Sequence, residues 1–557
     1  MIKRTLLAAS ILVACSGAFA EKDKSVTLEV LGTYESGIFD DSAAEIVAHD
    51  PANQRLFVIN AADSVVDVLD ISDPTDPTHD FEIDVTTDLT DAGGINSVAV
   101  HDDVVAVAVE RDNKQLNGWV AFYDTDGNFL KSVPAGALPD MLTFTPNGSY
   151  VLAANEGEPN DTYTNDPVGS VTVVDLRSGV MNATATQAGF GGFDDATADA
   201  AGVRTPQPYG ASVAQDLEPE YIAVSRDSKT AWVALQENNG LAVVDIPSAT
   251  VIALVGLGCK DHKLEGNGLD PSNRDEDVDN GPIKDGINIR NWPVCGLYMP
   301  DTITSYRSRG STWLITANEG DGRDYGFDAG GDDSQCNQVK SNWYLDEDDC
   351  VTYRDEARVK DVELALPGYI PAELDELQED ENLGRLKFVT TEGNTDADAA
   401  YEALYNFGAR SFTIWDTAGN VIYDSGDDFE QKTAAMIPDD FNSTNDENGS
   451  FDDRSDDKGP EPEGVVTGKV RGEVYAFIGL ERVGGIMVYN VTDPTDVRFS
   501  SYVNNRDFDE ADAEYAGDLG PEGLAFIKAA DSPNGKPILA VGNEVSGTTT
   551  LFQVVSQ

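Results

Sequence analysis

The sequence contains few basic residues: 37 Lys and Arg stand against 100 Asp and Glu, which gives a formal net charge of −63. Lys and Arg supply most of the attraction between proteins and the phosphates of nucleic acids or anionic lipids, so this composition excludes an ordinary nucleic-acid binder. Cations are the partners that such a surface attracts. With 40% hydrophobic residues the chain can still bury a large core, so its acidity does not indicate disorder.

Histidine is also scarce, with four residues in the whole chain, and the common catalytic motifs are missing. The sequence has no G-x-S-x-G, no H-E-x-x-H, no P-loop and no G-x-G-x-x-G. Together these absences argue against a Ser-His-Asp hydrolase and against a zinc protease.

Long apolar runs are absent after the first twenty residues, so we predict no transmembrane segment. Residues 1–20 resemble a secretory signal peptide, with Lys3 and Arg4 before an apolar stretch and an Ala-Phe-Ala cleavage site ending at Ala20. A lipoprotein signal is the alternative, because Leu-Val-Ala precedes Cys15. Either signal predicts export to the periplasm or the extracellular space, and lipidation of Cys15 predicts an outer-membrane lipoprotein.

Cysteine is rare as well, and Cys15 is accounted for by the signal sequence. The four others are Cys259, Cys295, Cys336 and Cys350. An even number in an oxidising compartment favours two disulfides over metal or nucleophile roles. Of the three pairings, we expect the two that join neighbours in the sequence, 259 with 295 and 336 with 350.

What the sequence does contain is a sevenfold repeat of short apolar strands separated by turns. The first strands of the repeats begin at Glu45, Asn96, Asp140, Glu220, Asp301, Glu463 and Glu522. Groups of four short strands are typical of a β-propeller, and we predict an all-β, seven-bladed propeller over residues 21–557. The last repeat lacks one strand, which residues 26–34 can supply to close the ring. Two or three sandwich domains are the alternative, but they do not explain the sevenfold register.

Acidic residues recur at equivalent positions of the repeats and form two columns. The first strands start with Glu45, Asp140, Glu220, Asp301, Glu463 and Glu522, and the second strands end before Glu110, Glu156, Glu237, Glu319, Glu481 and Glu544. Since the second strand of a blade runs antiparallel to the first, both columns meet at one mouth of the central channel. Like charges packed together are costly unless a cation compensates them. Oxygen ligands and few histidines predict several Ca²⁺ ions rather than zinc.

Long insertions are expected on the same face, at residues 257–300, 320–409 and 425–460. They carry Lys260, His262 and Arg323, which we assign as candidates to stabilise charge on an anionic substrate beside the metal ions. Salt bridges to nearby acids are the alternative role for these three residues.

Several long motifs resemble the choice-of-anchor I family. They are ESGIFDDSAAEIVAHD (35–50), LPDMLTFTPNGSYVLAANEGEPN (138–160), DLEPEYIAVS (216–225), LQENNGLAVVDI (235–246), KDHKLEGNGLD (260–270), TANEGDGRDY (316–325) and GPEPEGVV (459–466). That family includes proteins named atypical alkaline phosphatases and mesenchyme-specific cell-surface glycoproteins. The resemblance implies an exported propeller with variable membrane attachment. The Glu-Pro-Glu strand starts are also similar, more distantly, to phytase-like esterase propellers.

Three functional hypotheses follow from these patterns. In the first, the chain is a monomeric calcium-dependent phosphomonoesterase in which bound metal activates a water molecule that attacks a small phosphorylated substrate. In the second, it is a non-catalytic calcium-binding surface or matrix protein whose acidic face binds mineral, polymer or a partner. In the third, the acidity mainly keeps the protein soluble in a salty medium.

Overall fold

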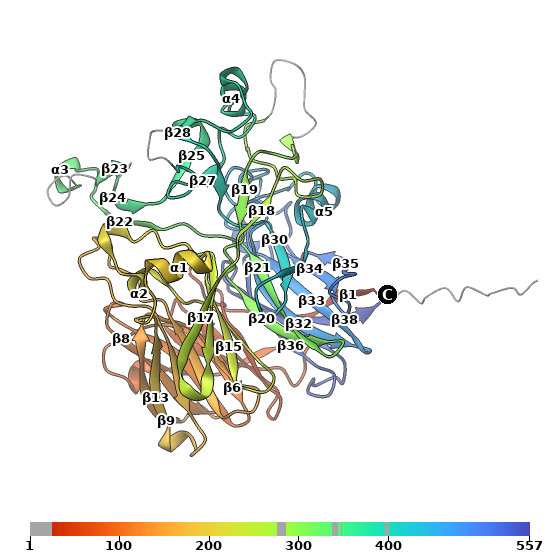
Figure 1. Ribbon diagram of the computed structural model, residues 1–557. Helices are drawn as coiled ribbons and strands as arrows, with labels where there is room; N and C mark the ends of the chain where they lie inside the picture. The colour runs from red at the N-terminus through yellow and green to blue at the C-terminus, as the bar shows by residue number, and fades with distance from the viewer. Residues whose placement is uncertain (1–24, 276–285, 337–342, 347, 396–399) are drawn as a thin grey trace, which may run out of the picture.

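The computed structural model describes residues 25–275, 286–336, 343–346, 348–395 and 400–557. The predicted signal peptide and Cys15 lie outside the described residues. Within them the fold is all-β, with a few short helices in the connections (Figure 1). These helices are α1 (Asp195–Ala201), α2 (Val213–Asp216), α3 (Asp333–Cys336), α4 (Pro371–Leu377) and α5 (Asp428–Met436). The described part of the chain has no helix that is long and apolar enough to cross a membrane.

Four-stranded antiparallel sheets make up the body of the molecule, and the described residues form seven of them. The first sheet consists of β2 (Val47–Asp50), β3 (Arg55–Asn60), β4 (Val65–Asp70) and β5 (Thr78–Asp84), and the second of β6 (Ala92–His101), β7 (Val104–Arg111), β8 (Asn117–Asp124) and β9 (Phe129–Ala137). The third consists of β10 (Pro139–Phe144), β11 (Tyr150–Asn155), β12 (Ser170–Asp175) and β13 (Thr184–Gly189), and the fourth of β14 (Ile222–Val224), β15 (Thr230–Leu235), β16 (Gly240–Asp245) and β17 (Thr250–Gly256). The fifth sheet consists of β20 (Ile303–Ser308), β21 (Ser311–Asn318), β30 (Ser411–Trp415) and β31 (Val421–Asp424), and the sixth of β32 (Pro462–Val470), β33 (Glu473–Leu480), β34 (Ile486–Asn490) and β35 (Arg498–Val503). The seventh consists of β36 (Pro521–Ile527), β37 (Ile538–Asn543), β38 (Thr548–Ser556) and β1 (Val26–Glu35).

The first strands of successive sheets contact one another in a cycle. The order is β2, β6, β10, β14, β20, β32 and β36, and β36 contacts β2 again. A cyclic array of four-stranded antiparallel sheets is the arrangement of a β-propeller. In the last sheet β1 pairs antiparallel with β38, so the first and last strands of the described residues share one sheet (Figure 1).

The core lies between adjacent sheets, which explains why the second strands are almost continuously apolar. In β15, Ala231, Val233 and Leu235 pack toward β11 and β12, whereas Trp232 and Ala234 pack on the opposite face against Leu314 and Trp415. Both faces of such a strand are buried, so the usual alternation of apolar and polar residues disappears.

The insertions form small sheets to one side of the large ones, at the top of Figure 1. They comprise β18 (Cys259–Asp261), β19 (Cys295–Leu297) and β29 (Tyr405–Asn406); β22 (Asp324–Asp328), β23 (Tyr344–Asp346) and β24 (Asp349–Arg354); β25 (Glu356–Arg358) with β27 (Lys387–Val389); and β26 (Glu363–Leu364) with β28 (Ala400–Tyr401). Disulfides join Cys259 to Cys295 and Cys336 to Cys350, which confirms both expected pairings.

Candidate metal-binding site

The starts of the first strands line a central cavity of about 190 Å³. In β10, β32 and β36 the pairing with the second strand is irregular just after the opening proline, so the acid that follows each proline leaves the regular ladder. Carboxylates dominate the lining, which comprises Asp140, Glu156, Glu220, Asp301, Glu463 and Glu522 with Ile46, Asn96, Met141, Tyr221 and Thr302. Five members of the first predicted column and one of the second therefore meet at one place.

Buried asparagines position several acids of the second column. Asn155 Nδ2 donates to the Ser170 carbonyl at 2.9 Å, and Asn318 Nδ2 donates to Thr413 Oγ1 at 2.7 Å. Each side chain thereby bonds to the neighbouring strand of its own sheet and holds the strand end from which Glu156 or Glu319 projects. Sequence analysis did not assign this role, although the recurring Ala-Asn-Glu at 154–156 and 317–319 was its signal.

Three groups of carboxylates among the described residues place one oxygen of each member within 4.8 Å of the others. They are Glu45 with Glu522 and Glu544, Asp301 with Glu319 and Glu463, and Glu319 with Glu461 and Glu481. Glu110 and Glu237 lie outside these groups. Glu110 accepts a hydrogen bond from the Gly94 amide at 3.2 Å and lies 3.9 Å from Lys114 Nζ, while the charge of Arg323 acts on Glu237.

Burial makes the charged form of most of these acids unfavourable. It raises the pKa of Glu45 to about 8, with the neighbouring Glu544 adding to the effect, and the pKa of Asp140 to about 7, with help from Glu158. Burial also raises the pKa of Glu220, Glu463 and Glu522 well above the ordinary range. A group in such a place has to acquire either a proton or a cation.

The same three glutamates each have one buried oxygen, Oε2, without a hydrogen-bond partner among the described residues. Glu237 has another. Buried carboxylate oxygens are normally hydrogen-bonded, because leaving them unpaired costs free energy. Unpaired oxygens that belong to acids around one cavity are the donor set that a metal ion requires.

Internal cations neutralise another part of the acidic face. In both Glu-Pro-Glu motifs the first glutamate is paired: Arg323 Nη2 lies 2.6 Å from Glu218 Oε2, and Arg454 Nε lies 2.8 Å from Glu461 Oε1. Although burial opposes it, the positive charges of Arg454, Lys458 and Arg482 hold the pKa of Glu461 below its ordinary value. The second glutamate of each motif, in contrast, lines the cavity.

Lys458 reaches the acids from the insertion that precedes β32. Its Nζ lies 2.6 Å from Glu319 Oε1 and 3.4 Å from Glu461 Oε2. Glu481 is paired in the same region, 3.0 Å from Arg482 Nη2. The acidic face thus has a compensated sector around Lys458 and an uncompensated one around the cavity and Glu45.

The three candidate charge-stabilising residues are held by other groups. Lys260 Nζ donates to the Gly426 carbonyl at 2.7 Å and lies 3.8 Å from Asp424. His262 is fully buried, with Nδ1 2.7 Å from the Asn267 carbonyl, and burial together with Lys260 lowers its pKa far below the ordinary value. Arg323 is the one whose charge acts on a column acid, although its closest ion pair is to Glu218. Their catalytic role stays a prediction.

Comparisons with known proteins place this architecture in a family. Two curated relatives match. Gigasin-3a of Magallana gigas is 33% identical over 191 residues, which are 32% of this chain and 66% of that protein. The mesenchyme-specific cell surface glycoprotein of Strongylocentrotus purpuratus is 27% identical over 308 residues, which are 51% of this chain and 36% of that protein. The chain thus spans no more than about two thirds of either relative. Among solved structures, the Cps50 (Swd1) β-propeller domain of Myceliophteria thermophila matches with a TM-score of 0.41 at 8% identity, covering 95% of this chain and all of that one.

The model of the choice-of-anchor I domain matches residues 45–494, which is most of the chain. The match includes the first five of the four-stranded sheets, the first three strands of the sixth, and all of the insertions with small sheets. The resemblance carried by the seven long motifs is therefore confirmed, and the chain belongs to the choice-of-anchor I domain family.

Proposed function

We propose that this chain is an exported, calcium-binding β-propeller whose central carboxylates hold several Ca²⁺ ions. The unpaired buried oxygens of Glu220, Glu463 and Glu522 around one cavity carry the proposal. Calcium accepts six to eight oxygen ligands in irregular geometry, which suits acids that come from different sheets. Magnesium needs a near-ideal octahedron and suits them less well.

The proposal includes seven blades and closure of the ring by the N-terminal strand. The cyclic contacts between first strands support the blade count, and the pairing of Val26 with Ser556 and of Glu35 with Thr548 supports closure by β1. Such a ring fixes the acids of all blades around one axis, so the spacing of the ligands depends on the whole fold rather than on one loop.

Export is supported by the two disulfides, which persist in oxidising compartments, and by family membership. One relative carries the name of a cell surface glycoprotein. We extend this to the present chain as a proposal: it acts outside the cytoplasm, and its calcium-loaded face binds an anionic polymer, mineral or partner. Bound Ca²⁺ would reverse the local charge and allow such contacts.

A calcium-dependent phosphomonoesterase is the second candidate. Metal ions at the same carboxylates would bind phosphate oxygens and supply a nucleophilic hydroxide from water. Of the three candidate cations, Arg323 is the one whose charge acts on a column acid; its Nη1 lies 3.8 Å from Asp216 Oδ1 and has no hydrogen-bond partner among the described residues. The engagement of Lys260 with Gly426 and of Arg323 with Glu218 favours binding over hydrolysis.

The test combines metal binding and turnover. Metal-free protein, Glu220→Gln and Glu463→Gln are titrated with CaCl₂ by calorimetry, with the exposed acid in Glu363→Gln as the matched control. We expect several bound ions in the wild type and fewer in both cavity variants. The control should bind as many ions as the wild type. Hydrolysis of p-nitrophenyl phosphate with calcium and then with chelator decides between the two candidates. Equal calcium binding by all four proteins would refute the proposed site.

A further inference from the structure

A bulge in the outer strand of the first large sheet turns two residues, three positions apart, toward one face. In a regular strand His79 and Glu82 would point to opposite faces. The pairing of β4 with β5 shifts here and leaves Asp80 as an extra residue, so His79 and Glu82 share the face of Asp67. Asp80 itself pairs with Arg55 at 2.7 Å. Asp67 and Glu82 are directly opposite each other in the ladder.

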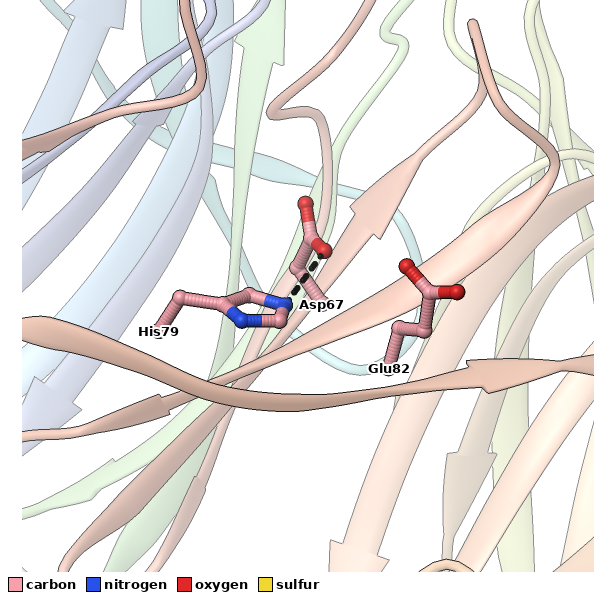
Figure 2. A group of neighbouring side chains, drawn as sticks. All are labelled: Asp67, His79 and Glu82. Carbon is pink, nitrogen blue, oxygen red and sulfur yellow. Dashed lines mark ion pairs between the residues drawn. The ribbon is translucent and has the colours of Figure 1, made fainter.

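These three side chains come together (Figure 2), with one ligand atom of each within 4.8 Å of the others. His79 Nε2 lies 3.3 Å from Asp67 Oδ1. The other oxygen of Asp67 accepts a hydrogen bond from Asn60 Nδ2 at 3.1 Å, which holds the buried carboxylate in place. The ring of Tyr34 on β1 stacks on His79, with 6.4 Å between ring centroids. Partners of this kind orient metal ligands in known sites.

The arrangement has an electrostatic cost that a cation would remove. Like charges directly opposite each other on adjacent strands destabilise a sheet. Asp67 is only 6% exposed, so water screens its charge poorly. A divalent ion between Asp67 and Glu82 would convert this repulsion into attraction, and the imidazole of His79 offers a nitrogen donor beside them.

We infer that Asp67, His79 and Glu82 form a site for a divalent transition cation of the Zn²⁺ class, separate from the proposed calcium site. Zinc bonds to imidazole nitrogen and carboxylate oxygen are 2.0–2.2 Å long, so two ligand atoms of a tetrahedral site lie about 3.4 Å apart. The 3.3 Å between His79 and Asp67 matches this separation. Glu82 is exposed and can close on the ion, and water completes the shell. Calcium, which needs six to eight oxygens, fits this donor set poorly.

The experiment measures Zn²⁺ binding to the full exported chain in excess Ca²⁺, which competes with Zn²⁺ at the carboxylates of the proposed calcium site. Calorimetry with ZnCl₂ and the visible absorption of bound Co²⁺ are recorded for the wild type, His79→Ala and Glu82→Gln. His101→Ala is the matched control, since the His101 side chain is 32% exposed against 37% for His79, and the described residues give His101 one ion pair, at 3.9 Å to Asp102.

We expect one tightly bound Zn²⁺ per wild-type chain, an affinity at least about tenfold weaker in both site variants, and no change in the control. Bound Co²⁺ should show the intense absorption of a four-coordinate site in the wild type and lose it in His79→Ala. The circular dichroism of the metal-free variants verifies their fold. Equal Zn²⁺ affinity in the wild type and His79→Ala, or displacement of Zn²⁺ by Ca²⁺, would overturn the inference. The outcome is independent of whether the central carboxylates bind calcium.

Discussion

Replacing Glu45 with glutamine tests whether the uncompensated acids destabilise the metal-free protein. Glu45 lies in a group with Glu522 and Glu544, and burial raises its pKa from about 4.5 to about 8. The folded state therefore holds this proton more tightly than the unfolded state does. The resulting stabilisation is complete below about pH 4.5 and is lost as the pH rises through 8.

The size of the effect follows from the same shift. A difference of this size in pKa corresponds to about 5 kcal/mol at most. Because Glu45 is only half-buried, solvent screens part of its charge, and we expect about 2 kcal/mol. For a chain of this length, 1 kcal/mol changes Tm by about 1 °C. In chelator at pH 9, Glu45→Gln should therefore melt about 2 °C above the wild type.

The assay is thermal unfolding at pH 5 and at pH 9, with chelator and with calcium. At pH 5 the two proteins should melt alike, since Glu45 is protonated in the wild type. Calcium at pH 9 should raise the Tm of the wild type more than that of Glu45→Gln, because the variant lacks one charged ligand. Glu363→Gln, on the exposed surface of an insertion, should match the wild type throughout.

Two results would refute this reasoning. A Glu45→Gln variant that melts below the wild type in chelator at pH 9 would show that the charged form of Glu45 stabilises the fold. An equal rise in Tm on calcium addition for both proteins would remove Glu45 from the calcium site.

The remaining predictions concern the compensated acids and a disulfide. Lys458→Met should lower the free energy of unfolding by about 3 to 5 kcal/mol, because it leaves Glu319 buried without its cation. Urea unfolding measures this loss, and a decrease of less than about 1 kcal/mol would contradict the pairing of Lys458 with Glu319. Glu218→Gln should lower the free energy of unfolding by about 3 kcal/mol, because it leaves Arg323 buried without its closest ion-pair partner. The calcium affinity of this variant should equal that of the wild type, since Glu218 does not line the cavity. Cys259→Ser opens a bridge that spans 36 residues and should cost about 4 kcal/mol in urea unfolding, with unaltered calcium stoichiometry.

Much of the site could be predicted because each acid follows a local rule. A proline and an acid open β10, β32 and β36, whereas β11, β21 and β37 each end at an asparagine that a glutamate follows. Equivalent positions in repeated sheets face the same axis, so alignment of the repeats was enough to bring Asp140, Glu220 and Glu463 to one cavity.

The partners of these acids could not be predicted in this way. Lys458 and Arg323 belong to insertions that differ from one repeat to the next, and no repeat rule says where such segments return. The bulge at Asp80 is equally hidden, since period-two alternation places His79 and Glu82 on opposite faces. A shift of one residue in the ladder was needed to bring them together.

The sequence by itself determined the all-β repeat, the two disulfide pairings and the columns of acids, because strand alternation, turn residues and cysteine spacing are local or periodic signals. Only the tertiary structure decided which acids are neutralised by Lys458 and Arg323, which keep unpaired buried oxygens, and which meet a histidine. Those outcomes depend on distances of a few ångströms between segments far apart in the chain. Which carboxylates can bind a metal therefore depends on their burial and on their ion-pair partners, and the net charge of −63 alone does not identify them.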